Sequence, residues 1–459
     1  MPAAAARIDT KQLIDEHPFG GYQVCIFLMC FAIATLDGFD SIMIGAAVPG
    51  MLATLKLQPV AIGWIFTLQA LGVIAGAIVL GPLADRVGRK HMLIVATLIF
   101  GFFSLLIAYS TTFTEIAIYR ALSGVGLGGA VPSALAFGCE YAPQRMRATV
   151  TTGIWLALPL GGMLSGFTGI WLIPHYGWTI LFVIGGIVPL IVAALAYMVL
   201  PESLSYLSER GTDQAQMRRI AIRIAPELGN QPDAQFFSSE EKAPGVLVAR
   251  LFTDGRAVST LLLWAVFFLS FFIMIFFVSW APTLLTKLGA TQQQASGTLV
   301  AWNIGSMLAT LIIGRLIDKT GYFRVLPWAF IVIALAVWVL GALVTQSYLI
   351  VAFLIATVGF FVGGSNSGLM ALAATSYPVS LRSTGVGWAY GVGGRVGSMV
   401  GPMLGGVLLQ NGWSASEICY VMGLPVLLGS GVLWLLKRET ERRNQGAVAP
   451  VASSPVPAE

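Results

Sequence analysis

Two aspartates lie three residues apart inside a long, largely apolar stretch of this chain. Asp37 and Asp40 belong to the sequence LDGFD, within the run from Tyr22 to Ala47. Residues i and i+3 share one face of a helix, so both carboxylates can point to the same side. Two acids this close in a low-dielectric medium cannot both be ionised cheaply, and at least one is expected to titrate near neutral pH. The pair is a candidate proton carrier. The alternative is that one aspartate caps an irregular turn or pairs with an arginine.

Two arginines also fall inside apolar stretches, Arg120 and Arg395. A guanidinium stays charged, and its planar fork can bind both oxygens of a carboxylate. Either arginine could therefore hold the carboxylate of a substrate. Arg120 could instead pair internally with Asp37 or Asp40, and the two roles are compatible because a proton arriving at the aspartate could free the arginine. Arg395 likewise has structural pairing as its alternative.

Aromatic and amide side chains within the apolar stretches could contact the rest of such a substrate. Each of them could equally serve helix packing, because membrane proteins use aromatic residues freely in their cores. The two asparagines are costly in lipid unless they find a partner, which favours them as functional candidates. The candidate contacts are Trp155, Asn303, Asn366, Trp388 and Tyr390.

The apolar residues come in blocks that are long enough to cross a bilayer. Hydrophobic residues make up 57% of the 459 residues and charged residues 10%, against about 25% charged residues in soluble domains. Weak alternation at the strand period argues against a β-barrel, so an all-α integral membrane protein is predicted. The twelve predicted helices have the approximate limits 22–47, 61–80, 92–110, 115–139, 148–172, 178–200, 256–284, 295–316, 327–346, 348–375, 384–409 and 414–436.

The basic residues are distributed very unevenly between the connecting loops. If the N-terminus is cytoplasmic, Lys56 and Lys287 are on the outer side, Arg120 and Arg395 are inside helices, and the other 22 of the 26 Lys and Arg residues are on the inner side. This asymmetry fixes an even number of spans with both termini in the cytoplasm. The net charge of +5 is thus explained by topology, and no nucleic-acid partner is expected.

Two sequence echoes indicate that the chain is a duplicated six-helix unit. GPLADRVGRKHML (81–93) resembles GRLIDKTGYFRVL (314–326), and PQRMRAT resembles PVSLRST. The echoes occur in the same order and at similar separations. Two pseudo-symmetric six-helix bundles are therefore predicted, with a substrate site at their interface near the middle of the membrane. The predicted divisions are a first bundle at 1–200, an amphipathic cytoplasmic loop at 201–255, a second bundle at 256–436 and a disordered cytoplasmic tail at 437–459.

The charged residues of the two echoed loops are candidates for a gate. Their side chains can pair with neighbouring helix ends on the cytoplasmic side and hold the two bundles open to the outside. Phe323 and Arg324 depart from the Arg-Lys pair of the first loop, so the second set is expected to be weaker. The gate candidates are Asp85, Arg86, Arg89, Glu140, Arg147, Asp318, Arg324 and Arg382.

These motifs resemble a known transporter fold. The loop GPLADRVGRK and the helix YRALSGVGLGGAVPS resemble motifs of the major facilitator superfamily. Within it, LDGFD, LLLW, SWAPTLL and LPES resemble the aromatic acid:proton symporter family. The resemblance implies that the chain imports benzoate-type or phenylpropanoid acids across a bacterial inner membrane, and that both acids of DGFD are required.

Other classes of function lack sequence support. GVGLGG lies within an apolar helix with no preceding strand, and no G-x-x-x-x-G-K-[ST] motif occurs, so nucleotide binding is not expected. His17, His91 and His175 are scattered in loops, so no metal site or other cofactor is expected. We therefore predict a monomeric secondary transporter, and not an enzyme, that imports an aromatic carboxylate with one or more protons. The alternatives are a transporter of an aliphatic dicarboxylate or nicotinate-type acid, a drug:proton antiporter, and a transporter-like receptor.

Overall fold

The computed structural model describes residues 7–210, 214–230, 235–237, 248–253, 255–378 and 381–448. Within this part of the chain, twelve helical segments are long and apolar enough to cross a membrane. Each coincides with one of the predicted blocks, so the prediction of a twelve-helix membrane protein is confirmed. The segments are α2 (Gly21–Leu55), α3 (Pro59–Val87), α4 (Arg89–Ile107), α5 (Phe113–Glu140), α6 (Gln144–Tyr176), α7 (Thr179–Val199), α10 (Ala257–Lys287), α11 (Gln292–Thr320), α12 (Tyr322–Leu343), α13 (Tyr348–Ser376), the composite α14 (Arg382–Trp388), η4 (Ala389–Gly394) and α15 (Arg395–Gln410), and α16 (Ala415–Val448).

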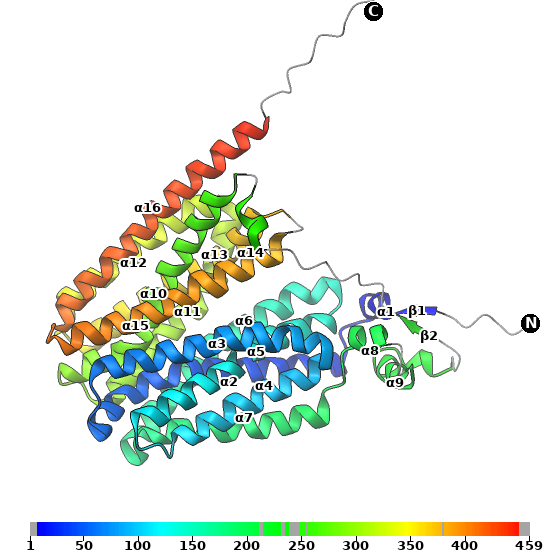
Figure 1. The fold of residues 1–459 in the computed structure, drawn as a ribbon, viewed down its shortest axis with the longest axis horizontal. Coiled ribbons are helices and arrows are strands. Elements are labelled where there is room, and N and C mark those ends of the chain that lie inside the picture. The colour runs from blue at the N-terminus through cyan, green and yellow to red at the C-terminus, as the bar shows by residue number, and fades with distance from the viewer. Residues whose placement is uncertain are drawn as a thin grey trace, which may run out of the picture.

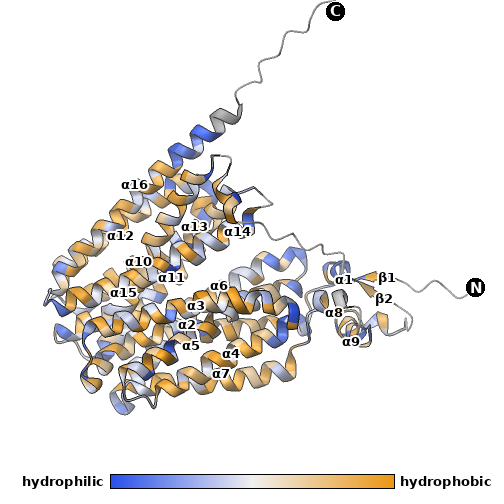
Figure 2. Ribbon diagram, viewed as in Figure 1, coloured by the Kyte–Doolittle hydropathy of each residue, from blue (hydrophilic) through white to orange (hydrophobic). Residues whose placement is uncertain are grey.

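The segments form two bundles, α2–α7 and α10–α16, which Figure 1 shows side by side, the first running from blue to blue-green and the second from green to red. Hydrophobic residues predominate along the helices and hydrophilic residues gather towards their ends (Figure 2). The echoed loops have the same backbone geometry in both bundles. Gly88 and Gly321 both have positive φ, 113° and 89°, a conformation that glycine adopts without strain. This explains why the two loops share a glycine at equivalent positions.

We call the segment 201–255 the linker. The two bundles touch on the side of the molecule away from it, and we call this side the far side. The contacts between them join α2 to α10, α3 to α15 and α6 to α11. A Cβ atom at Gly45 would collide with the carbonyl oxygen of Val278, and one at Gly166 would press on Val300. On the other side, where both termini and the linker lie and which we call the linker side, the ribbons of the two bundles diverge (Figure 1).

The linker begins with a small folded unit that the sequence did not predict. β1 (Arg7–Asp9) pairs in parallel with β2 (Gln235–Phe237) beside α1 (Thr10–Glu16), α8 (Leu204–Arg210), α9 (Gln214–Ile224) and η1 (Pro226–Asn230). The apolar face of α9, including Met217 and Ile220, is buried in the same hydrophobic cluster as α2 and α5 of the first bundle. We call residues 7–17 and 204–237 the cap. The cap therefore belongs to the first bundle, and η2 (Val248–Phe252) precedes the second.

The last helix is longer than predicted. α16 continues to Val448, so residues 437–448 of the expected disordered tail are helical. A Lys437–Glu441 ion pair one turn apart, with a 3.8 Å N–O distance, accompanies this extension. The rest of the predicted tail, 449–459, lies outside the described residues.

Candidate functional site

Asp40 and Arg120 form an ion pair buried within the first bundle. Arg120 Nη1 donates to Asp40 Oδ2 at 2.8 Å, and both side chains are 0% exposed. Arg120 Nη2 donates to the backbone carbonyl of Asp40 and to Gln69 Oε1, each at 3.1 Å. Of the two alternatives that the sequence left open for Arg120, the internal pair is therefore present in this conformation.

Further polar groups complete the surroundings of this ion pair. The Ser104 hydroxyl donates to Asp40 Oδ1 and lies 3.3 Å from the Ser123 hydroxyl, while the guanidinium of Arg120 lies over the Phe182 ring at 5.8 Å. Side chains from α2, α3, α4, α5 and α7 thus meet around this one ion pair. A buried charge is tolerated when it is paired and hydrogen-bonded. The sequence did not single out Gln69, Ser104 or Ser123. The one sequence feature that could have identified them is that they are polar residues within membrane helices, which tend to form hydrogen bonds across helices.

Asp37 lies one turn before Asp40 and has very different surroundings. Its side chain is buried, and among the described residues Oδ2 has no hydrogen-bond partner. The Ser41 hydroxyl is within hydrogen-bonding reach, and the charge of Arg395, from the second bundle, acts on Asp37. A buried carboxylate oxygen without a donor is costly when it is ionised. The position therefore suits an acid that can take up and release a proton.

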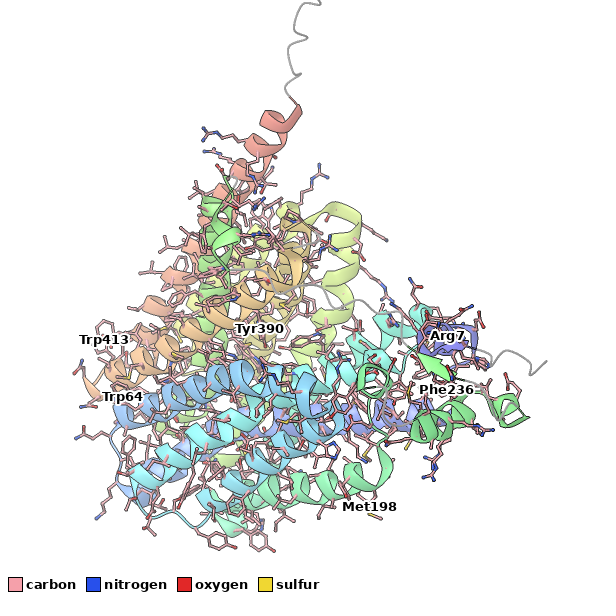
Figure 3. The ribbon with its side chains drawn as sticks, turned by 45° about the vertical axis from the view of Figure 1, so that its right-hand side comes forward. Arg7, Trp64, Met198, Phe236, Tyr390 and Trp413 are labelled. Atoms are coloured by element: carbon pink, nitrogen blue, oxygen red, sulfur yellow. The ribbon has the colours of Figure 1, made fainter. Side chains whose placement is uncertain are left out.

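Arg395 follows the π-helical turn η4 and is half-buried. Its guanidinium carbon lies 5.6 Å from the centre of the Tyr390 ring. Tyr390 also packs edge-to-face with Phe271 of α10, at 5.2 Å between ring centres, and with Trp155 of α6, at 6.1 Å. Because α6 belongs to the first bundle, Tyr390 lies at the boundary between bundles, as Figure 3 shows. Phe271 was not predicted, since nothing distinguishes it from the other aromatic residues of its helix.

The other predicted contacts are spread over the second bundle. Asn303 is buried where α11 meets α6, donates to the Leu299 carbonyl and lies close to Gly162. Asn366 accepts a hydrogen bond from Ser270 and donates to the Met274 sulfur, at the contact of α13 with α10. Trp388 stacks on Trp264, with ring centres 6.1 Å apart. The structure therefore brings together Arg395, Tyr390 and Trp155, with the charge of Arg395 acting on Asp37, and Trp388 stacks on a different partner.

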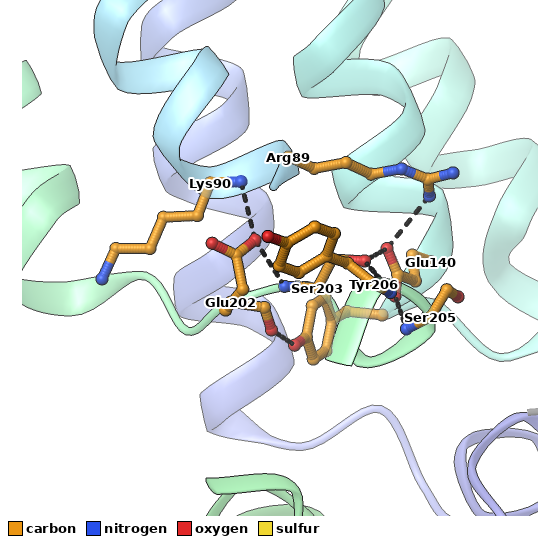
Figure 4. Close-up of polar contacts among 8 residues, drawn as sticks. Arg89, Lys90, Glu140, Glu202, Ser203, Ser205 and Tyr206 are labelled. Carbon is orange, nitrogen blue, oxygen red and sulfur yellow. Dashed lines mark hydrogen bonds and ion pairs between the residues drawn. The ribbon is translucent and has the colours of Figure 1, made fainter. Parts of the chain in front are cut away.

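Two of the gate candidates, Arg89 and Glu140, belong to a polar cluster on the linker side (Figure 4). Arg89 pairs with Glu140 at 3.0 Å, and Glu140 also accepts hydrogen bonds from Ser203 and from the backbone N–H of Ser205. Glu202 accepts from the Lys90 N–H and contacts His91 Nδ1 at 2.7 Å. Glu202 comes from LPES, and its role here was not predicted. These contacts join α4 and α5 to the start of the linker, all on the first bundle.

Most of the remaining gate candidates are exposed. Arg147 donates to the Ala142 carbonyl at 3.2 Å, and Arg86 is exposed. The backbone of Asp85 belongs to α3, but its side chain lies outside the described part of the structure. On the second bundle, the corresponding side chains are all exposed. They are Asp318, Arg324 and Arg382.

Comparison with characterised proteins identifies the family. A family model of the Major Facilitator Superfamily matches residues 30–390 and 262–458. The chain is 34% identical to the 4-hydroxybenzoate transporter PcaK of Acinetobacter baylyi, over 91% of this chain and 92% of that one. It is 34% identical to a gallate transporter of Pseudomonas putida, over 92% and 94%. It is 31% identical to the 3-(3-hydroxy-phenyl)propionate transporter of Escherichia coli, over 90% and 94%.

Solved structures show the same fold at low sequence identity. The partially occluded inward-open xylose transporter XylE of E. coli matches with a TM-score of 0.70 at 16% identity, over 95% of this chain and all of that one. A bacterial homologue of the lysosomal transporter Spinster matches with a TM-score of 0.70 at 15% identity, over 92% and 98%. The predictions of fold and of a transporter rather than an enzyme are confirmed: the chain is a multi-pass membrane protein that belongs to the Major Facilitator Superfamily, and the relatives named above are transporters of aromatic acids.

Proposed function

We propose that this protein imports an aromatic carboxylate together with a proton across the bacterial inner membrane, with both termini in the cytoplasm. The names of its relatives support the class of substrate. The observation that carries the proposal is the arrangement at the bundle boundary. A buried acid with an unpaired oxygen, Asp37, lies under the influence of Arg395 from the other bundle, and Arg395 is stacked on the aromatic ring of Tyr390.

The carboxylates of Asp37 and of the substrate would take turns beside Arg395. This exchange would couple the proton to the substrate. When the site is open to the outside, Asp37 binds a proton and loses its charge, and the substrate carboxylate then binds the fork of Arg395. After the bundles rock, the substrate leaves into the cytoplasm. Asp37 releases its proton there and again becomes the anion nearest Arg395. Asp40 remains paired with Arg120 throughout, because both belong to the same bundle.

The membrane potential favours symport over uniport. An anion that enters a negatively charged cell works against about 2.3 kcal/mol per 100 mV. One accompanying proton cancels this cost, and a second would add a driving force. The contacts between the bundles on the far side are those of a transporter closed to the outside, which is the state expected to release substrate inwards.

We also propose that the charged residues of the two echoed loops form the gate on the cytoplasmic side. Pairs between the bundles would hold the outward-open state and separate when the cytoplasmic side opens. The exposure of Asp318, Arg324 and Arg382 fits the separated state. The Arg89–Glu140 pair would keep the first loop in shape. Because one chain supplies every group of the proposed site, we expect the monomer to be the functional unit.

Transport assays in proteoliposomes test this proposal. Radiolabelled 4-hydroxybenzoate should accumulate when the outer solution is made acidic, and collapse of the proton gradient by a protonophore should stop accumulation. An excess of unlabelled benzoate should compete, whereas succinate should not, which separates aromatic acids from aliphatic dicarboxylates. Accumulation that does not depend on the proton gradient, or efflux of a cationic drug in its place, would contradict the proposal.

A further inference from the structure

We propose that Tyr390, brought beneath Arg395 by the π-helical turn, makes this site selective for flat aromatic acids over non-aromatic acids of the same size. This inference deepens the proposed function and rests on it. It concerns the residues that contact the ring of the substrate. The proton-coupling acid, Asp37, concerns the charge of the substrate instead.

The π-helical turn explains how Tyr390 and Arg395 come together. Residues five apart on an α-helix are separated by about 140° around the axis, because each residue turns the helix by about 100°. In a π-helix the hydrogen bond joins residues i and i+5, so these positions lie above one another. The π-helix spans Ala389–Gly394, and the Arg395 guanidinium carbon lies 5.6 Å from the Tyr390 ring centre. The irregular turn therefore places an aromatic face directly beside a cation.

The sequence of this turn allows it to pack closely against α10 within the second bundle. Gly393 and Gly394 are buried against α10. A Cβ atom at Gly393 would lie 2.8 Å from the Trp264 carbonyl oxygen, and one at Gly394 would lie 3.0 Å from the Phe271 ring. These glycines bring the backbone of the turn close to α10, so that Tyr390 can rest on Phe271. Tyr390 is thereby held in place before any substrate arrives.

Both bundles contribute to the aromatic surface. Phe271 contacts Tyr390 from the second bundle and Trp155 contacts it from the first, both edge-to-face. A substrate ring placed against Tyr390 and Trp155 keeps its carboxylate within reach of Arg395. Flat rings gain about 0.5–1.5 kcal/mol from such contacts beyond the burial of their area. A saturated ring of equal carbon number buries similar area but has no π system, so it gains only the burial.

Arg120 shows what distinguishes a substrate-binding arginine from a structural one. It also lies over an aromatic ring, that of Phe182 at 5.8 Å. However, its terminal nitrogens already donate to Asp40 and Gln69, and its side chain is 0% exposed. Arg395 is half-buried at the bundle boundary. The ring beside Arg395 is therefore the one that a substrate can share.

Competition binding on the purified full-length protein tests the inference. Benzoate and cyclohexanecarboxylate have the same carbon skeleton and charge, and each is used to displace radiolabelled 4-hydroxybenzoate. The wild type should prefer benzoate, and Tyr390→Leu should reduce that preference about three- to tenfold. Tyr390→Phe should retain it. Trp413→Leu is the matched control, since Trp413 lies on the far side of the second bundle (Figure 3), and it should leave the preference unchanged.

The outcomes separate the two proposals. If Tyr390→Leu keeps the preference of the wild type, or if Trp413→Leu loses it equally, the assignment of Tyr390 is wrong while the transport function stands. If the wild type binds neither acid, the proposed function itself fails. Should Tyr390→Leu prove unfolded, Trp155→Leu removes the contact from the other bundle and should lower the same preference, and an unchanged value would overturn the inference.

Discussion

Arg120 and Arg395, the arginines of the apolar stretches, are placed differently with respect to Asp40 and Asp37. Arg120 and Asp40 are paired inside one bundle, fully buried, with further hydrogen bonds to Gln69 and from Ser104. Arg395 and Asp37 come from different bundles, and Asp37 keeps an unpaired oxygen. When two bundles rock as rigid bodies, contacts within a bundle persist and contacts between them change. Under the proposed function, the first pair belongs to the scaffold and the second to the transport cycle.

Replacing each arginine, Arg120 or Arg395, by glutamine should have the largest effects on stability and binding, and the two effects should differ most. Arg120→Gln leaves Asp40 as an uncompensated buried charge, which should lower the free energy of unfolding by about 3–5 kcal/mol. Arg395→Gln removes a half-buried cation and should change stability far less, while abolishing substrate binding. Melting temperatures of the purified proteins in detergent measure the first effect, and ligand binding measures the second. Equal destabilisation by both substitutions would contradict the comparison.

Neutralising both partners of the buried pair sharpens the result. Asp40→Asn combined with Arg120→Gln removes both buried charges, so neither is left without its counter-charge. The double variant should recover most of the stability lost in Arg120→Gln and should still couple uptake to protons. If the double variant is folded and binds substrate but no longer moves protons, Asp40 carries the proton and the assignment is reversed.

Closure of the far side should depend on close packing at Gly45. A side chain there would collide with the Val278 carbonyl of the other bundle, so Gly45→Val should hold the far side open and stop net transport. A cysteine introduced at Ser296, which is buried beside Gly169 where α6 meets α11, should then react with an impermeant thiol reagent. Gly81→Val is the control, because a Cβ atom at Gly81 meets no neighbour within 4 Å. Equal reactivity in both variants would contradict the prediction.

The smallest expected effect concerns a third titratable pair, His17 and Glu227, which lies in the cap, far from Arg120 and Arg395. The hydrogen bond to Glu227, at 2.6 Å, raises the pKa of His17 above its ordinary value. Its contribution to the stability of the cap is therefore present below the ordinary pKa and is lost as the pH rises through the raised value. The effect should be slight, because both side chains are partly exposed to solvent.

Hydrogen exchange of α1, corrected for the intrinsic effect of pH, measures this loosening of the cap. His17→Gln should abolish the pH difference in protection and leave the pH dependence of transport unchanged. A transport profile that shifts in His17→Gln would show that Asp37 is not the sole source of the pH dependence.

The spans and the duplicated halves could be predicted because each depends on local sequence. Apolar blocks of sufficient length and the uneven distribution of basic residues define the membrane helices without knowledge of their packing. Asp37, Asp40, Arg120 and Arg395 could be selected because charges within membrane helices are costly and therefore rare.

The partners of these charged residues could not be predicted from the sequence. Asp37 and Asp40 lie on similar faces of one helix, and only the packing of α3, α4 and α5 decides that Asp40 receives Arg120. The π-helical turn depends on the contact of Gly393 and Gly394 with α10, which the glycines alone do not specify. The cap was missed because a short amphipathic helix such as α9 could equally bury its apolar face elsewhere. Glu202 was missed for a similar reason, since its partners come from α4.

Proton movement on substrate binding tests the central claim most directly. Benzoate is added to the purified protein in weakly buffered detergent solution over a pH series, and the protons taken up per benzoate bound are counted with a pH indicator. The wild type and the Asp40→Asn, Arg120→Gln double variant should both take up close to one proton over part of the series, because Asp37 is protonated as the carboxylate binds Arg395. Asp37→Asn should bind benzoate without taking up a proton. Proton uptake that persists in Asp37→Asn would contradict the account.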